Sequence, residues 1–128
     1  MKRSRERIII YMKINLKELG KTYEVKASNK NMRAIYQLQL DMNKVATLEE
    51  TDDPMALIQA QLDATTKVEN FITDILKLSK KEQEKLDDMD SETTIMLSQR
   101  ISMKLFGMSD KDIDEALSED DTDEEGKK

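Results

Sequence analysis

The sequence predicts a mainly α-helical fold: a small domain of four to five helices with a short N-terminal β-hairpin and a disordered acidic C-terminal tail. Three observations predict this class. The 128 residues include only three glycines and one proline, so tight turns must be few. Apolar residues recur every three or four positions through most of the chain after residue 29. Charged residues make up 38% of the chain, as do hydrophobic residues, which indicates a modest core with charged helix faces.

The length allows one domain, which we place at residues 12–118. Residues 1–11 differ from the rest because they carry four basic residues and one acid. They fit a basic nucleic-acid arm, a first strand, or a non-native or disordered extension. We favour the extension, because Met12 begins a second plausible start, Met-Lys-Ile-Asn-Leu.

Residues 12–27 predict a β-hairpin. Met12, Ile14 and Leu16 alternate with polar residues in the first strand, and Tyr23 and Val25 do so in the second. Gly20 lies between the two runs. Because an isolated hairpin is marginal in water, we expect this one to pack on the helices or on another chain.

Two longer helices follow. The first, residues 30–47, is expected to start after a cap at Ser28 or Asn29, and its apolar side chains follow a helical spacing. The second is expected to begin after Asp53, with Pro54 in its first turn, and to end near Leu78.

The last part of the chain predicts three shorter helices and a tail. A capping-box spacing at Ser79–Glu82 opens a helix at 80–89. Ser91 is expected to cap a helix at 92–106, and Gly107 to end it. Its expected inward side chains are Ile95, Leu97, Ile101, Leu105 and Phe106. A helix at 110–118 follows, with Ile113, Ala116 and Leu117 on one side, and residues 119–128 form the disordered acidic tail.

The composition excludes several classes of protein. The chain has no Cys and no His, so cysteine nucleophiles, disulfides, Cys/His zinc sites and histidine bases are ruled out. The three glycines cannot form a glycine-rich phosphate loop. No apolar run approaches the roughly 20 residues that span a bilayer. We therefore expect no enzyme, no cofactor, no membrane partner and a cytoplasmic protein.

An apparent calcium loop has a simpler explanation. Asp110, Asp112, Asp114 and Asp121 take loop positions 1, 3, 5 and 12, but Glu115 stands where the loop needs glycine. We interpret these acids as the start of a helix, where negative charge favours the helix dipole. No metal site is expected. The other carboxylate pairs, such as Asp87-Asp88, lie in polar segments and predict a charged surface, not acid–base chemistry.

The nine methionines allow two interpretations. Methionine fills irregular gaps in a thin core, and it is also favoured on surfaces that adapt to different apolar helices. The second interpretation predicts an adaptable groove for a partner helix.

The layout resembles the tail assembly chaperones of long-tailed phages and prophages of Gram-positive bacteria. The similarity spans about residues 12–118. It lies in the start MKINLKELGKTYEVKAS with its K-x-Y-E-V hairpin, in the helices and charged C-terminus that follow, and in the size. Chaperones of this family bind the tape measure protein, a long hydrophobic helical chain, and help tail tube subunits assemble around it.

The resemblance implies several further properties. The tape measure protein would be the main partner and the tail tube protein a further one. Apart from the resemblance, self-association is also open, because the second long helix is long for a small domain and part of it could pack against another chain. The chain would act in the bacterial host cytoplasm and be absent from the finished virion. The family commonly makes a longer product by programmed frameshifting, with which the terminal Gly126-Lys127-Lys128 is compatible.

We expect the partner-binding face on the two long helices. The expected contacts are Met55, Leu57, Ile58, Leu62, Met42 and Ile35. The first four lie in the less apolar half of the second long helix, where less local core is available to cover them.

Two other functions stay open at this point. A capsid scaffolding protein would also be helical, charged and self-associating. A helical nucleic-acid-binding regulator would use residues 2–7 and the patch of Lys26, Lys30 and Arg33, but the net charge of −6 opposes this. We therefore expect no nucleic-acid partner.

Overall fold

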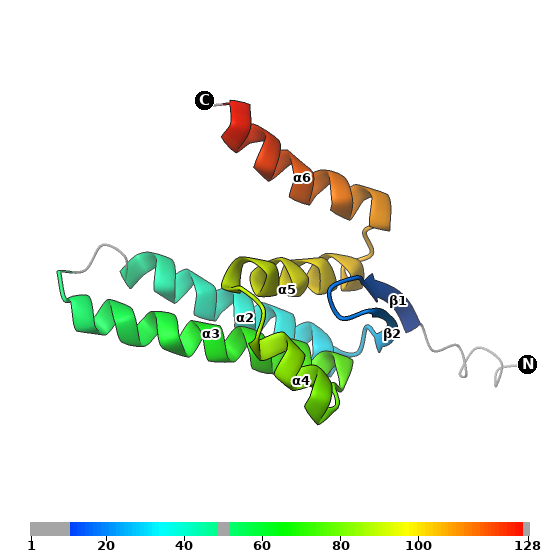
Figure 1. Cartoon of the computed structure of the whole chain (residues 1–128), viewed down its shortest axis with the longest axis horizontal. Helices are drawn as coiled ribbons and strands as arrows, with labels where there is room; N and C mark the ends of the chain where they lie inside the picture. The colour runs from blue at the N-terminus through cyan, green and yellow to red at the C-terminus, as the bar shows by residue number, and fades with distance from the viewer. Residues whose placement is uncertain (1–10, 49–51, 127–128) are drawn as a thin grey trace, which may run out of the picture.

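A computed structural model describes residues 11–48 and 52–126, with side chains through residue 118. The described part confirms the predicted fold class: an antiparallel two-stranded hairpin followed by helices (Figure 1). The elements are β1 (Tyr11–Leu16), β2 (Lys21–Lys26), α2 (Asn29–Leu48), α3 (Pro54–Leu76), α4 (Lys80–Asp87), α5 (Ser91–Leu105) and α6 (Asp110–Gly126). The N-terminal extension expected at residues 1–11 lies outside the described residues except for Tyr11, which begins β1.

The long helices α2 and α3 lie side by side and antiparallel, and they form the axis of the molecule (Figure 1). At one end, α5 packs against α3, the β-hairpin contacts both α3 and α5, and α4 contacts α3. At the other end, α2 and α3 continue alone. We call this projecting part the arm and define it as residues 44–48 and 54–66. Its two helices have no third layer in the described structure.

The hairpin forms as the alternation predicts. Ile14 pairs with Tyr23 and Met12 with Val25, which puts the apolar side chains of both strands on one face. Gly20 closes the turn at φ 76°, and its N–H donates to the carbonyl of Leu16 at 2.9 Å. Leu19 is buried in the same turn. The hairpin gains its stability by packing on α3 and α5.

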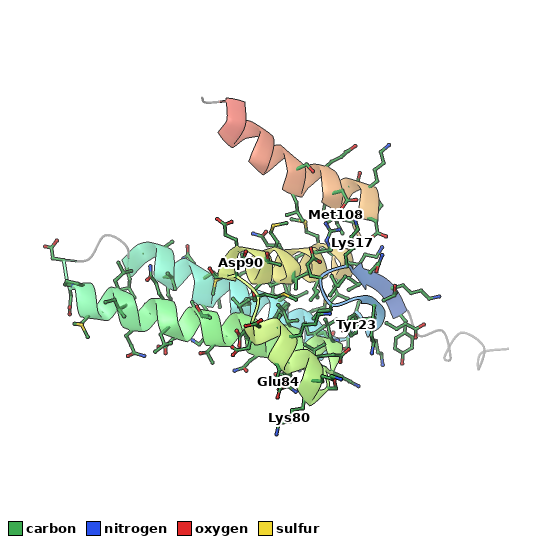
Figure 2. All side chains as sticks on the ribbon, in the orientation of Figure 1. Lys17, Tyr23, Lys80, Glu84, Asp90 and Met108 are labelled. Atoms are coloured by element: carbon green, nitrogen blue, oxygen red, sulfur yellow. The ribbon has the colours of Figure 1, made fainter. Side chains whose placement is uncertain are left out.

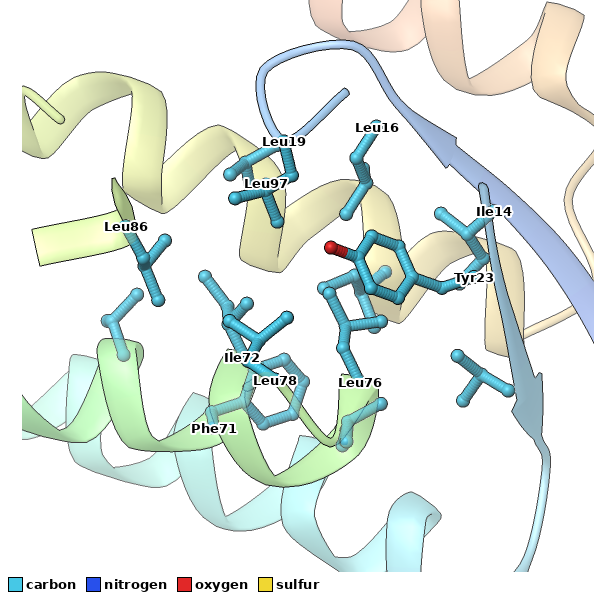
Figure 3. Packing of buried hydrophobic residues seen from close by; sticks show 14 of the residues in the cluster. Ile14, Leu16, Leu19, Tyr23, Phe71, Ile72, Leu76, Leu78, Leu86 and Leu97 are labelled. Carbon is cyan, nitrogen blue, oxygen red and sulfur yellow. The ribbon is translucent and has the colours of Figure 1, made fainter. Parts of the chain in front are cut away.

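The core joins the hairpin to the second half of α3 and to α5 (Figure 3). Its most buried side chains come from every element except the arm: Ile14, Leu16, Val25, Ile35, Ile72, Leu86, Leu97, Ile101 and Ile113. On α3 the fully buried residues begin only at Val68. The second half of α3, which is the more apolar half, therefore carries the core face.

Most helix starts follow the predicted caps. Ser28 Oγ accepts from the N–H of Asn31 at 3.1 Å, and Asp53 Oδ1 accepts from Met55 and Ala56 before Pro54 opens α3. The capping box of α4 is complete, because Ser79 Oγ accepts from Glu82 N–H and Glu82 Oε1 accepts from Ser79 N–H.

Four predicted boundaries are wrong. α4 ends at Asp87, two residues before the predicted residue 89. α3 ends at Leu76, two residues before the predicted Leu78, because Lys77 adopts the left-handed conformation at φ 55°. Asp90, not Ser91, caps α5: its carboxylate accepts from Thr93 N–H at 2.8 Å, and Ser91 is already helical. α6 continues past residue 118 to Gly126, since no glycine or proline interrupts the segment. The disorder expected for residues 119–128 stays a prediction.

The predicted inward face of α5 is partly wrong. Leu97, Ile101 and Leu105 are buried, whereas Ile95 and Phe106 are 42% and 45% exposed. Thr94 and Ser98 are buried in their place. Their hydroxyls donate to backbone carbonyls one turn back, at Asp90 and Ile95, so these small polar side chains enter the core without an unpaired donor.

Candidate functional site

The acidic residues at the start of α6 form a helix N-terminus, as predicted, and not a calcium loop. Residues 110–121, which would make up the loop, are helical. Ser109 Oγ accepts from Asp112 N–H at 3.1 Å, Asp110 pairs with Lys104 at 3.1 Å, and Asp114 pairs with Arg100 at 2.9 Å. These acids therefore fasten α6 to α5. Within residues 11–48 and 52–126, no group of three or more metal-type ligands is found.

One carboxylate pair does form across elements. Glu69 on α3 meets Asp87 at the end of α4 in a hydrogen bond, and burial, this hydrogen bond and the charge of Asp87 raise the pKa of Glu69. The sequence does not predict this pair, because nothing in the local pattern brings residues 69 and 87 together. The pair lies in the contact between α3 and the C-terminal end of α4.

Glu82 connects the hairpin to α4. Its Oε2 accepts from the hydroxyl of Tyr23 at 2.8 Å and pairs with Lys21 Nζ at 3.2 Å. Figure 2 shows Tyr23 on β2 beside α4. The backbone N–H of Ser79, the Tyr23 hydroxyl and Lys21 lower the pKa of Glu82 to about 2. Burial, with the nearby Glu82, raises the pKa of Tyr23, so both groups are structural and stay in their ordinary charge states at neutral pH.

The arm carries an exposed apolar row on α3. Met55, Ile58 and Leu62 are 70%, 56% and 60% exposed. Their spacing of three and four residues puts them on one face of the helix. We call Met55, Ile58 and Leu62 the α3 row. These are three of the predicted partner contacts, and they lie in the half of α3 that the core does not reach.

The other predicted contact residues do not belong to this row. Leu57 is half-buried, and the helical period puts it on the side of α3 away from Ile58 and Leu62. Met42 on α2 is half-buried and packs against the core. Ile35 is fully buried, so it supports the fold and is not on a surface that a partner can reach.

The positions that directly flank the α3 row are uncharged, and acidic residues lie only at its borders. The neighbouring positions on the same face are Gln59, Thr65 and Thr66, and the first charged residue farther along this face is Glu69. Asp63, at the edge of the face, accepts from Gln59 Nε2 at 3.0 Å. An uncharged apolar face is unusual for a chain with 38% charged residues, and it favours contact with another apolar helix.

A second apolar surface lies between α2 and α5. It is a groove of about 440 Å³, which we call the α2–α5 groove, lined by Leu38, Gln39, Met42, Asn43, Ile95, Ser98, Gln99, Ser102, Met103 and Phe106. The ring of Phe106 lies 6.0 Å from that of Tyr36 at its rim. The sequence does not predict this groove, because the apolar pattern of residues 92–106 places Ile95 and Phe106 in the core. Two methionines in its wall match the adaptable groove that the methionine count predicted in general terms.

The fold and its bare apolar helix surfaces are those of a small helical binding protein. The model of one protein family, described as phage tail assembly chaperone proteins (TAC), matches residues 12–122. The chain therefore belongs to the phage tail assembly chaperone family, as the resemblance in its sequence indicated. Searches of the curated proteins and of the solved structures returned no match. Among the described residues, no helix is long and apolar enough to span a membrane.

Proposed function

We propose that this chaperone binds the tape measure protein through the α3 row and keeps it soluble in the host cytoplasm while tail tube subunits assemble around it. The chaperone then leaves before the virion is complete. The observation that supports this most is the α3 row itself: three large apolar side chains, each more than half exposed, on a helix face without charge.

The geometry of the row suits a helical client. Met55 and Leu62 are seven residues apart, or about 10 Å along the helix axis, which corresponds to two turns of a client helix. Apolar residues at positions i, i+3 and i+7 are the usual anchors when one helix packs along another. The methionine and the uncharged flanks tolerate variation in the client side chains.

The expected strength of one contact is modest. Full burial of a large apolar side chain contributes roughly 1.5–3 kcal/mol, so covering the exposed parts of the three row residues contributes about 3–6 kcal/mol before ordering costs. One copy would therefore hold a single client helix weakly. A long client with many apolar helices would instead be covered by several copies along its length.

Co-expression with the tape measure protein tests this proposal. The wild-type chain should raise the soluble fraction of the tape measure protein, and Ile58→Asp or Leu62→Asp should abolish that increase. The matched control is Ile95→Asp, the same substitution at an exposed residue of the α2–α5 groove, which should retain it. Circular dichroism and thermal unfolding of each purified variant show that the fold is intact.

The variants separate the alternatives. If Ile95→Asp loses the effect and Ile58→Asp retains it, the client binds the groove and the row proposal is wrong. If Ile58→Asp and Leu62→Asp unfold the protein, these residues belong to the core. A chain that solubilises a capsid protein but not the tape measure protein would be a scaffolding factor.

We also propose that a second, longer product arises by programmed frameshifting near codons 126–128. The support is the family membership and the terminal Gly-Lys-Lys, which A-rich codons can encode. The nucleotide sequence tests this directly. A slippery heptamer there, with a longer product detected by mass spectrometry of infected cells, is the expected result. A sequence without such a heptamer contradicts it.

A further inference from the structure

The burial of the two long helices changes at the same level on both. On α2 the last buried residue is Asp41, and on α3 the first buried residue is Val68. A salt bridge joins the helices at this level, with Lys67 Nζ 3.4 Å from Asp41 Oδ1. In the arm, which lies beyond this bridge, none of the described residues is buried. The bridge therefore marks a border between the part of the molecule that has a core and the arm.

The contact between the two helices of the arm is thin. A pocket of about 140 Å³ lies between them, and Val45, Leu48, Ala60 and Ala64 are among the residues that line it. All four side chains are only half-buried. The two on α3 are alanines, which bury little apolar surface and contribute correspondingly little to the stability of the contact.

The first turns of α3 have no part of α2 beside them. Lys67 lies opposite Asp41, and the two helices are antiparallel, so Leu48 at the end of α2 lies opposite about residue 60 of α3. Residues 54–59 therefore extend past the end of α2, as Figure 1 shows. This extension carries two of the three residues of the α3 row.

Helix propensity is also low in the arm. α2 carries Thr47 there, and α3 carries the adjacent Thr65 and Thr66 directly before the border. Threonine is a poor helix former because its side chain is branched at Cβ. The hydroxyls of Thr47 and Thr65 each donate to the backbone carbonyl four residues back, at 3.0 Å. This kind of hydrogen bond slightly destabilises a helix and often bends it.

We propose that the arm is a separate unfolding unit: residues 44–48 and 54–66 unfold together while the core stays folded, and the Asp41–Lys67 bridge is the border of the unit. The two segments unfold together because they pack on each other and, in the described part of the chain, have no third layer. Few buried apolar contacts are what distinguishes such a unit from the rest of a domain.

The consequence for client binding rests on the proposed function. A client helix that covers the α3 row supplies the layer that the arm lacks, so it keeps the arm folded. Part of the binding energy is used to order the arm, which lowers the affinity for any one client helix. In return, an arm that unfolds and refolds can adjust the row to client helices with different side chains.

Amide hydrogen exchange of the client-free protein tests the unit, under conditions where refolding of the arm is faster than exchange. The amides of both arm segments should share one opening equilibrium, with an open population at least about 100-fold larger than that of the core around Ile72 and Ile101. A population that falls steadily from the tip towards Lys67 would mean that the helix ends fray separately. Arm amides as slow as those of the core would mean that there is no separate unit. Either result overturns the proposal.

Glycine at Ala60 tests whether the two segments unfold together. Ala60→Gly destabilises the α3 helix, so exchange in residues 54–66 should accelerate roughly fivefold. Residues 44–48, on the other helix, should accelerate by the same factor, and the core should not change. Ala64→Gly, one turn farther along α3, should give the same result. Acceleration limited to α3 overturns the proposal.

Ala116→Gly is the matched control, because it makes the same substitution at a half-buried alanine of α6, outside the arm. It should leave exchange in the arm unchanged. An equal acceleration of the arm in this variant would mean that the arm responds to the stability of the whole molecule, which also overturns the proposal.

These measurements do not contain the tape measure protein, so the two proposals can fail separately. An arm that does not unfold on its own, in a chain that solubilises the tape measure protein through the α3 row, overturns only the unfolding unit. An arm that unfolds as proposed, in a chain without effect on the tape measure protein, overturns only the proposed function.

Discussion

At the scale of single residues, the carboxylate of Glu82 links the start of α4 to β2, where it contacts Tyr23 and Lys21. Its pKa is lowered from 4.5 to about 2, so ionised Glu82 is favoured in the folded state. A lowered pKa contributes stability above the unfolded value, and this contribution is lost as the pH falls from about 4.5 to 2.

We therefore expect Glu82→Gln to destabilise the protein at pH 7 and to have progressively less effect as the pH approaches 2. Glutamine keeps the size and the capping position, so the variant removes mainly the charge. Urea denaturation across this pH range measures the difference from wild type. Glu84→Gln on the same helix is the control and should show no such pH-dependent difference; equal losses in both variants would mean that Glu82 has no special role.

Glu69 should show the opposite pH dependence. Its pKa is raised, so the folded state favours the protonated form, and the stability it contributes at low pH is lost as the pH rises through the folded pKa. Glu69→Gln should consequently stabilise the protein at pH 7, where burial and Asp87 oppose the charge, and lose this advantage at acid pH. Urea denaturation at pH 7 and at acid pH measures it, and a Glu69→Gln variant less stable at pH 7 than the wild type contradicts this account.

At the scale of elements, the sequence predicts the type and order of every described helix and strand, but it predicts the face of α5 only in part. The segment offers apolar side chains around more than one side, because Ile95, Leu97, Ile101 and Phe106 do not share a single face. The buried face of α5 includes Thr94 and Ser98, because their hydroxyls donate to the helix backbone and need no other partner. The periodicity of apolar residues does not show which face the neighbouring helices cover.

A pair of truncations tests the corrected face of α5. Ile101 is fully buried, so Ile101→Ala should lower the free energy of unfolding by about 2–5 kcal/mol. Ile95 is 42% exposed, so Ile95→Ala should change it by about 0.5 kcal/mol or less. Denaturant unfolding measures both changes in the free energy of unfolding. Similar changes at the two positions would contradict the finding that Ile101 faces the core and Ile95 the solvent.

The cap of α5 offers a second test at this scale. Asp90 accepts from Thr93 N–H, whereas Ser91 is already part of the helix. Hydrogen bonds from the side chain of Thr93 and then from its backbone lower the pKa of Asp90. Asp90→Ala should lower the midpoint of thermal unfolding, because an N–H of the first turn loses its acceptor. Ser91→Ala should leave the midpoint nearly unchanged, and the reverse ranking would restore Ser91 as the cap.

At the scale of the whole molecule, the candidate site could be predicted only where it depends on one helix. The sequence indicates Met55, Ile58 and Leu62 because they lie in the less apolar half of α3, where less local core can cover them, and all three are exposed. Ile35 was assigned to the same surface although it is buried, because the sequence does not show which side of α2 the hairpin and α5 cover. The α2–α5 groove depends on two elements about 60 residues apart, and no local pattern reveals it.

The measurement that tests the central proposal most directly is amide hydrogen exchange of the purified chaperone, free and bound to the tape measure protein, at a concentration where the free chain is monomeric. The bare arm should exchange readily in the free protein. We expect the client to slow exchange chiefly in residues 54–66, around Met55, Ile58 and Leu62, and to change the α5 helix little. Protection confined to α5 and the first half of α2, with exchange in residues 54–66 unaltered, would contradict the assignment of the α3 row as the client surface.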